Sequence, residues 1–220
     1  IYLPNGYDSN VKGEYPVIYL LDGSKDEDLI HVAGLVQFGS FPWVNPVPES
    51  IVVGIANVDR KRDFTYATNI MEDQDDFPTS GGSALFIEFI EKELQPFIAN
   101  NYKVTDAKTI IGQSLGGLLA AEILFKKPEL FDNYAIISPS LWWDNESLLA
   151  WSKPVFKTPK KIYIAIGREG VLMERPALQL FEKIDKDKFM NCEIEFEFFE
   201  DQNHGDILHL AVYSFFSKCF

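Results

Sequence analysis

Histidine and cysteine are both scarce in this chain, which has three histidines and two cysteines in 220 residues. The two cysteines, Cys192 and Cys219, lie apart in no metal-binding spacing, and no His-Glu-x-x-His segment occurs. The sequence therefore predicts no metal site. We expect two free buried thiols, with one disulfide as the alternative, so cysteine usage leaves the redox compartment open.

A long apolar run and an excess of positive charge are also absent. No segment reaches the roughly 18 consecutive apolar residues that a membrane-spanning helix needs. The formal net charge is −13, which argues against nucleic acid as a partner, because binding to phosphates depends on clustered lysine and arginine. No secretory signal is visible, but the chain begins at Ile1 without a methionine. We expect a processed or trimmed product, and the compartment stays open.

What the chain does contain is the composition of a globular protein with enough length for a sizeable core. Apolar residues make up 46% of it and charged residues 24%, both ordinary values. Aromatic residues reach 14%, with 18 phenylalanines, which suggests well-filled layers and an aromatic cleft. There is no internal repeat and no linker rich in glycine, serine or proline, so we expect a single domain over residues 1–220.

Short apolar runs alternate with amphipathic segments along the sequence. Strands are predicted at residues 16–21, 51–56, 109–111, 134–137, 161–166 and 193–199. Helices are predicted at residues 26–38, 83–102 with a kink at Pro96, 115–125, 171–184 and 206–218, and polar loops at 5–14 and 57–80. This alternation implies an α/β fold whose mostly parallel central sheet is flanked by helices on both faces. Residues 193–199 alternate glutamate with isoleucine or phenylalanine, as a strand near a sheet edge does.

Polar side chains follow several of the predicted strands directly. In a parallel sheet the carboxyl ends of the strands meet at one rim, where ligands bind. Six candidate residues fall at that rim: Ser24, Arg60, Ser114, Ser138, Glu169 and His204. The sequence therefore predicts a functional site there.

The segment around Ser114 has the pattern of a nucleophile elbow. Gly112-Gln113-Ser114-Leu115-Gly116 joins a short apolar strand to an apolar helical pattern, which is the context that a G-x-S-x-G motif requires. The glycines leave room where strand and helix pass close together, and the sharp turn lifts the serine hydroxyl clear of both. The Leu115 N–H then points toward charge that develops on a bound carbonyl.

His204 is the candidate base, because it lies in a polar loop between a late strand and the last helix, after the serine in chain order. Glu169 is our preferred acid, since it follows a predicted strand in a turn flanked by glycines. Glu174 is the second candidate for the acid. Glu200 and Asp201, which are close to His204 in sequence, are further alternatives for orienting it.

The loop after residues 16–21 is the expected source of a second oxyanion donor. We choose the Ser24 N–H, because Gly23 lets the backbone turn inward. Candidates for contacts with substrate are Asp22, Arg60, Arg62, Trp142 and Trp143. Two alternatives stay open here: Arg62 pairs with Asp63 or Asp59 and only holds its loop, and the tryptophans only pack.

A set of motifs in order along most of the chain carries a resemblance to a known family. They are PVIYLLDG at 16–23, RKRD at 60–63, TSGG at 79–82, GQSLGG at 112–117, SPSLWW at 138–143 and NHG at 203–205. Together they resemble the Putative esterase family of α/β hydrolases. That family groups siderophore trilactone esterases with relatives of S-formylglutathione hydrolase, feruloyl esterases and mycolyltransferases. SPSLWW and the R-x-R-D segment are most similar to the trilactone esterase branch.

The resemblance implies an α/β-hydrolase fold, with the family's first strands absent or trimmed before Ile1. It also implies a serine carboxylic-ester hydrolase that acts on a small-molecule ester without a cofactor, through Ser114 and His204. Some members of the branch manage with serine and histidine alone, so Glu169 is either the acid or dispensable. Two other functions stay open: acyl transfer to a sugar or another alcohol, and a non-catalytic carbohydrate-binding relative.

Overall fold

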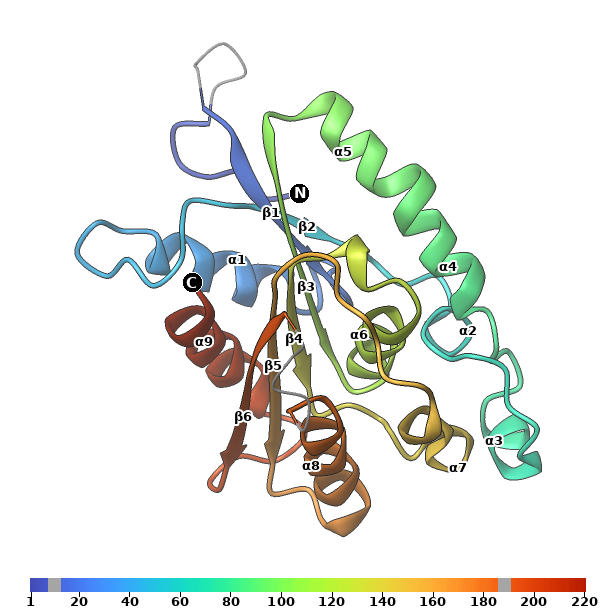
Figure 1. The fold of residues 1–220 in the computed structure, drawn as a ribbon. Helices are drawn as coiled ribbons and strands as arrows, with labels where there is room; N and C mark the ends of the chain where they lie inside the picture. Colours follow the sequence, from blue (N-terminus) through green and yellow to red (C-terminus); the bar gives the residue numbers. More distant parts are fainter. Residues whose placement is uncertain (8–12, 186–190) are drawn as a thin grey trace.

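The computed structural model describes residues 1–7, 13–185 and 191–220. A six-stranded parallel sheet forms its centre, in the order β2-β1-β3-β4-β5-β6 (Figure 1). The strands are β1 (Tyr15–Leu20), β2 (Ile51–Gly54), β3 (Val104–Gln113), β4 (Asn133–Ile137), β5 (Lys160–Gly167) and β6 (Cys192–Phe199). The predicted parallel sheet is confirmed. Part of the loop expected over 5–14, namely 8–12, lies outside the described residues.

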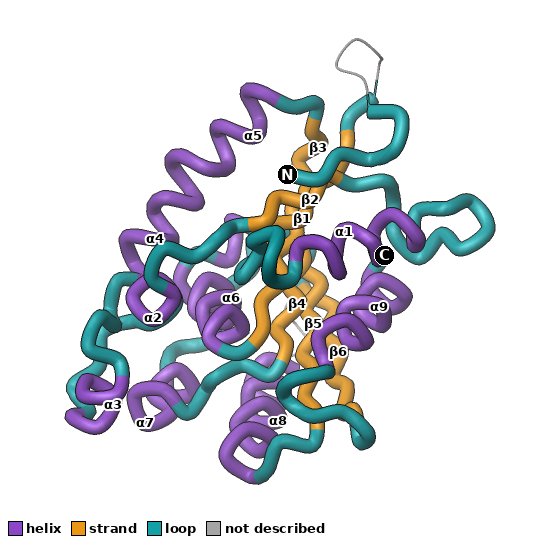
Figure 2. The backbone as a smooth tube through the Cα atoms, turned by 180° about the vertical axis from the view of Figure 1, so that it is seen from behind, coloured by secondary structure: helices purple, strands orange, loops and turns teal. Residues whose placement is uncertain are grey.

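Helices cover both faces of the sheet (Figures 1 and 2). The longer ones are α1 (Leu29–Gly39), α4 (Ser83–Phe89), α5 (Gln95–Asn101), α6 (Leu115–Lys126), α8 (Val171–Asp185) and α9 (Ile207–Cys219). α1 and α9 pack side by side on one face, whereas α4, α5, α6 and α8 lie on the other. The α/β architecture expected from the alternating pattern is therefore observed.

Strand β1 shows why its sequence is continuously apolar. Val17 and Tyr19 point into the core beneath α6, and Ile18 and Leu20 point into the core beneath α1 and α9. All four are about 1% exposed. A strand with helices on both faces has no wet side, so it cannot alternate. β6 does alternate, and it forms one edge of the sheet, as predicted.

The helical segment expected over 83–102 is observed with a local deviation before Pro96, and the loop expected over 57–80 needs correction. The segment expected as one helix over 83–102 contains a π-helical turn (Ile90–Leu94) between α4 and α5. That turn lies just before Pro96, which cannot donate a backbone bond and crowds the preceding carbonyls. The segment expected as a loop over 57–80 contains α2 (Arg60–Asp63) and α3 (Met71–Asp76). These helices are too short to leave a periodic pattern in the sequence.

The strand order changes direction at β1, and this marks one place on the rim of the sheet. The chain leaves β1 toward β2 and later returns to β3 on the opposite side of β1. The loops after β1 and β3 therefore diverge from neighbouring strands, and a crevice opens between them. Ser24 follows β1 and Ser114 follows β3, so both lie at this switch point.

Candidate active site

Ser114 lies in a strained turn between β3 and α6. Its φ and ψ are 60° and −122°, a conformation that a residue with a Cβ rarely adopts. The turn is possible because its neighbours have no side chains. A Cβ on Gly112 would lie 2.4 Å from the Gly116 carbonyl oxygen, and one on Gly117 would lie 2.8 Å from the Ile137 oxygen.

We expect the substitution Gly112→Ala to destabilise the fold by about 3 kcal/mol, because the new methyl group meets backbone that cannot move aside. Gly34→Ala is the matched control. Gly34 lies in α1 with open space at its Cβ position, so alanine there should leave stability unchanged or raise it by up to about 1 kcal/mol. Urea denaturation of both variants measures the difference. Equal midpoints for the two variants would contradict the close packing of strand and helix.

His204 is oriented by Glu169, which comes from the loop after β5. His204 Nδ1 lies 2.6 Å from Glu169 Oε2. A carboxylate at Nδ1 favours the tautomer that carries its proton there, which leaves Nε2 as the proton acceptor. The amide of Gln113, the last residue of β3, donates to the His204 carbonyl oxygen at 2.5 Å. This bond ties the histidine loop to the serine turn.

Glu169 is held as a carboxylate in a closed position. Its side chain is 2% exposed, whereas that of His204 is 45% exposed. Burial alone would raise the pKa of Glu169, but hydrogen bonds from His204, Ser138 and the Gly167 N–H outweigh burial, and the pKa lies below its ordinary value. Glu169 therefore stays ionised while it faces the imidazole.

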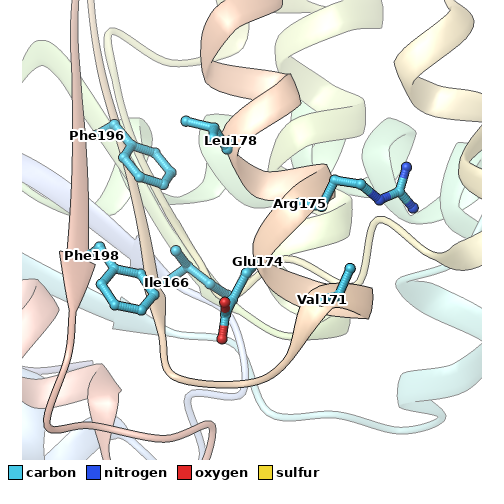
Figure 3. Close-up of a pocket in the computed structure, with 7 residues that line it drawn as sticks. All are labelled: Ile166, Val171, Glu174, Arg175, Leu178, Phe196 and Phe198. Carbon is cyan, nitrogen blue, oxygen red and sulfur yellow. The ribbon is translucent and has the colours of Figure 1, made fainter.

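The alternative acids lie elsewhere. Glu174 Oε1 accepts the backbone N–H groups of Glu169 and Gly170 at 2.8 and 2.7 Å. Figure 3 shows Glu174 among apolar side chains. The groove that these residues line, between α8 and β6, has a volume of about 390 Å³. The Glu174 carboxylate anchors the turn that presents Glu169. Glu200 is exposed and pairs with Arg168 at 2.8 Å.

Ser114 and His204 lie where two hollows meet. The larger, of about 420 Å³, is lined also by Ser140, Trp142, Arg168, Glu169, Met173 and Asn203. The smaller, of about 360 Å³, is lined also by Asp22, Glu27, Asp28, Arg60 and Gln113. An ester has an acyl half and an alcohol half, and two hollows beside one hydroxyl suit such a molecule.

The Ser114 hydroxyl has a second hydroxyl as its neighbour. Ser114 Oγ lies 3.4 Å from Ser140 Oγ, and Ser140 is 2% exposed. Among the described residues, Ser114 forms no hydrogen bond with the His204 ring. Such contacts are often long in a site without substrate and shorten when it binds. The arrangement therefore suits proton transfer after a small rotation of the serine.

The two backbone N–H groups expected to bind an oxyanion differ in their hydrogen bonding. Leu115 is the first residue of α6, and the first amide of a helix has no partner within it. The Ser24 N–H instead donates to Glu27 Oε2 at 3.2 Å. Sequence reasoning did not single out Glu27, Gln113 or Ser140, although all three line the hollows.

Charge in the smaller hollow is mainly negative. Arg60 makes a forked pair with Asp22, at 2.7 and 3.0 Å, so its charge is already matched. Burial, then the charges of Asp22 and Glu27, raise the pKa of Asp28 to about 6, although His31 and Arg60 act in the opposite direction.

The other expected substrate contacts divide by position. Trp142 lines the larger hollow. Trp143 is fully buried and donates its indole N–H to the Tyr66 carbonyl oxygen at 2.9 Å, so it packs in the core. Arg62 pairs with Asp63 at 2.7 Å and lines neither hollow. The packing and pairing alternatives therefore describe Trp143 and Arg62.

The cysteines, membrane-spanning helices and metal ligands were also subjects of sequence predictions. Both cysteines are free; Cys219 is buried and Cys192 half-buried. Within the described ranges, no helix combines the length and the hydropathy that crossing a membrane requires. The same residues bring no three histidine, cysteine, aspartate or glutamate side chains together as ligands for a metal ion.

The chain is similar to known proteins over most of its length. Residues 1–205 match the model of the family described as Putative esterase. The ferri-bacillibactin esterase BesA of Bacillus subtilis (strain 168) is 31% identical over 221 residues, which cover 90% of this chain and 76% of BesA. Two crystal structures superpose with a TM-score of 0.84. The BES protein from Bacillus cereus is 27% identical, with 98% of this chain and 86% of that chain covered. An IroE-like serine hydrolase from Shewanella oneidensis is 28% identical, with 98% and 73% covered.

Proposed function

The chain belongs to the Putative esterase family, on the branch that includes siderophore esterases, and we propose that it hydrolyses carboxylic esters through an acyl-enzyme on Ser114. It is an esterase, as its family and relatives establish. The observation that carries the mechanism is the contact of 2.6 Å between His204 Nδ1 and Glu169, beside a serine in a strained elbow. A nucleophile, a base and an orienting acid at one cleft are the parts that acyl transfer needs.

In the proposed reaction, Ser114 Oγ attacks the ester carbonyl carbon while His204 Nε2 takes the hydroxyl proton. The carbonyl π electrons move to oxygen, and the Leu115 and Ser24 N–H groups bind the resulting oxyanion. When the tetrahedral intermediate collapses, the C–O bond to the alcohol breaks and His204 gives its proton to the departing oxygen. A water molecule then repeats the sequence on the acyl-enzyme, which releases the acid and restores Ser114.

The substrate class that we propose is a siderophore ester. The name of BesA supports this choice, as a ferri-bacillibactin esterase that aligns with most of this chain. The larger hollow adds a physical reason. Arg168 lines it, and its ion pair with Glu200 is exposed to solvent, so a substrate anion can compete for the guanidinium. The hollow can therefore hold an anionic acyl half, although the whole chain carries a charge of −13.

A burst experiment tests the function directly. With p-nitrophenyl acetate and butyrate, we expect an initial release of nitrophenol near one equivalent of enzyme, followed by slower turnover. A fluorophosphonate should label Ser114, which peptide mass spectrometry identifies. Adding a sugar or another alcohol as acceptor would reveal acyl transfer as extra ester product. No turnover and no labelling would contradict the hydrolase and favour a binding relative of the fold.

A further inference from the structure

The Ser24 N–H, which our mechanism assigns to the oxyanion, is already engaged in this structure. Its partner is the Glu27 carboxylate, at 3.2 Å from nitrogen to Oε2. The segment Ser24-Lys25-Asp26-Glu27 has the spacing of a capping box, in which a glutamate reaches back to the backbone N–H three residues earlier. The Glu27 N–H in turn donates to the Ser24 carbonyl oxygen at 3.2 Å. A local turn therefore holds an anionic oxygen at this donor.

The position of that oxygen has a consequence for catalysis. An oxyanion donor must lie about 2.7–3.1 Å from the oxygen that gains charge. A carboxylate that accepts the same N–H competes with the substrate for it, and its charge repels the oxyanion as well. Glu27 also lines the smaller hollow together with Ser114 and His204, so substrate and Glu27 meet in the same space.

We propose that Glu27 is a gate on the oxyanion hole, which opens when its carboxylate leaves the Ser24 N–H. The proposal rests on the proposed function, because it assigns Ser24 to the oxyanion. Glu27 is exposed, and its carboxylate forms no other hydrogen bond or ion pair among the described residues, so rotation of its side chain breaks a single bond.

The gate also makes Glu27 a specificity residue. An ester that carries an ammonium group in the smaller hollow attracts the carboxylate away from the amide, whereas a neutral ester must displace it unaided. An ester with a carboxylate there meets two further negative groups, Asp22 and Asp28, of which Arg60 matches only the first. We therefore expect kcat/KM to be highest for esters whose half in this hollow is cationic, lower for neutral ones and lowest for anionic ones.

Two variants separate occupancy of the amide from charge. Glu27→Ala removes both, and we expect kcat/KM for p-nitrophenyl butyrate to rise about three- to tenfold, the factor that one net hydrogen bond supplies. Phenylboronic acid, which forms a tetrahedral anion on an active serine, should bind more tightly by a similar factor. Glu27→Gln keeps an acceptor for the amide without the charge, so its gain should be smaller. Both variants should show a smaller preference for choline butyrate over the monobutyryl ester of glycolate, because Asp28 still faces the hollow.

Asp26→Ala is the matched control, because Asp26 is an exposed carboxylate in the same turn that lines neither hollow. It removes the same charge and should leave all three measurements within about twofold of wild type. A folded Glu27→Ala enzyme with unchanged or lower kcat/KM and boronate affinity would overturn the gate. If alanine disrupts the turn, an unchanged charge preference in Glu27→Gln overturns it instead. Wild-type enzyme without turnover or labelling of Ser114 would indicate failure of the proposed function, which is a separate result.

Discussion

Replacing Ser114 with alanine is expected to lower kcat for p-nitrophenyl butyrate by about 10⁶-fold, with KM nearly unchanged. In the proposed mechanism the Ser114 hydroxyl oxygen forms the bond to the acyl group, so no acyl-enzyme can form without it. His204→Ala should cost about as much, and the double variant no more than either single one, because serine and histidine act as one unit. A residual acceleration of about 10³-fold over water should persist from the oxyanion donors.

Ser140→Ala is the informative comparison for that experiment. Its hydroxyl lies 3.4 Å from Ser114 Oγ in the same hollow, so Ser140 is the alternative candidate for the nucleophile. It sits on the loop after β4 rather than at the N-terminus of a helix, and we expect a loss of less than about tenfold. The opposite result, with Ser140 essential and Ser114 dispensable, would contradict our assignment and place the nucleophile in the loop after β4. Active-site titration with a fluorophosphonate normalises the rates to competent enzyme.

The parts of this site that were predictable from sequence are those fixed by local chain geometry. A G-x-S-x-G segment between a strand and a helix requires a sharp turn with glycines on both sides of the serine. In the structure, Gly112 and Gly116 do lie against each other. The rim argument needed only the order of strands and helices, and it brought Ser114, Glu169 and His204 to one edge. Neither inference required a side-chain contact between distant segments.

The parts that were missed depend on such contacts. Gln113 reaches His204 across 91 positions of sequence, and Ser138 reaches Glu169 across 31. No local pattern specifies either pairing, because each depends on where the ends of different strands come together, β3 and β6 in the first case and β4 and β5 in the second. Trp143 shows the opposite error. Its place beside Trp142 suggested a cleft wall, but the turn that follows β4 directs it into the core.

Glu27 was missed for a different reason, since its signal is local. Ser24-x-x-Glu27 has the spacing of a capping box, and a glutamate that reaches back to the N–H of an oxyanion loop predicts competition for that N–H. The pattern is visible in the sequence, but the Ser24 N–H that it uses to stabilise the turn is the same N–H that we assign to the oxyanion. A motif that stabilises a turn can therefore limit the chemistry of the same turn.

The remaining large effect concerns Glu169. Glu169→Gln preserves the size of the side chain but presents Nδ1 with a neutral amide, which no longer fixes the productive tautomer or stabilises the imidazolium. We expect kcat to fall by about 10⁴-fold, the loss that an amide causes at this position of a triad. Glu200→Gln is the control, because Glu200 is an exposed carboxylate paired with Arg168 and not with His204. A loss below tenfold for Glu169→Gln would assign catalysis to Ser114 and His204 alone.

The pH dependence distinguishes a catalytic role of Glu169 from a structural one. Its pKa is lowered below the ordinary value of 4.5, so the stability that its ionised form contributes is present above pH 4.5 and is lost as pH falls through the lowered pKa. Chemical denaturation should therefore show wild type more stable than Glu169→Gln at pH 7, with a difference that shrinks as pH falls below 4.5. Between pH 6 and pH 8 that difference in stability is constant, because Glu169 is ionised throughout. Rates of wild type and Glu169→Gln compared within this range therefore report the lost contact with His204 rather than a changing stability.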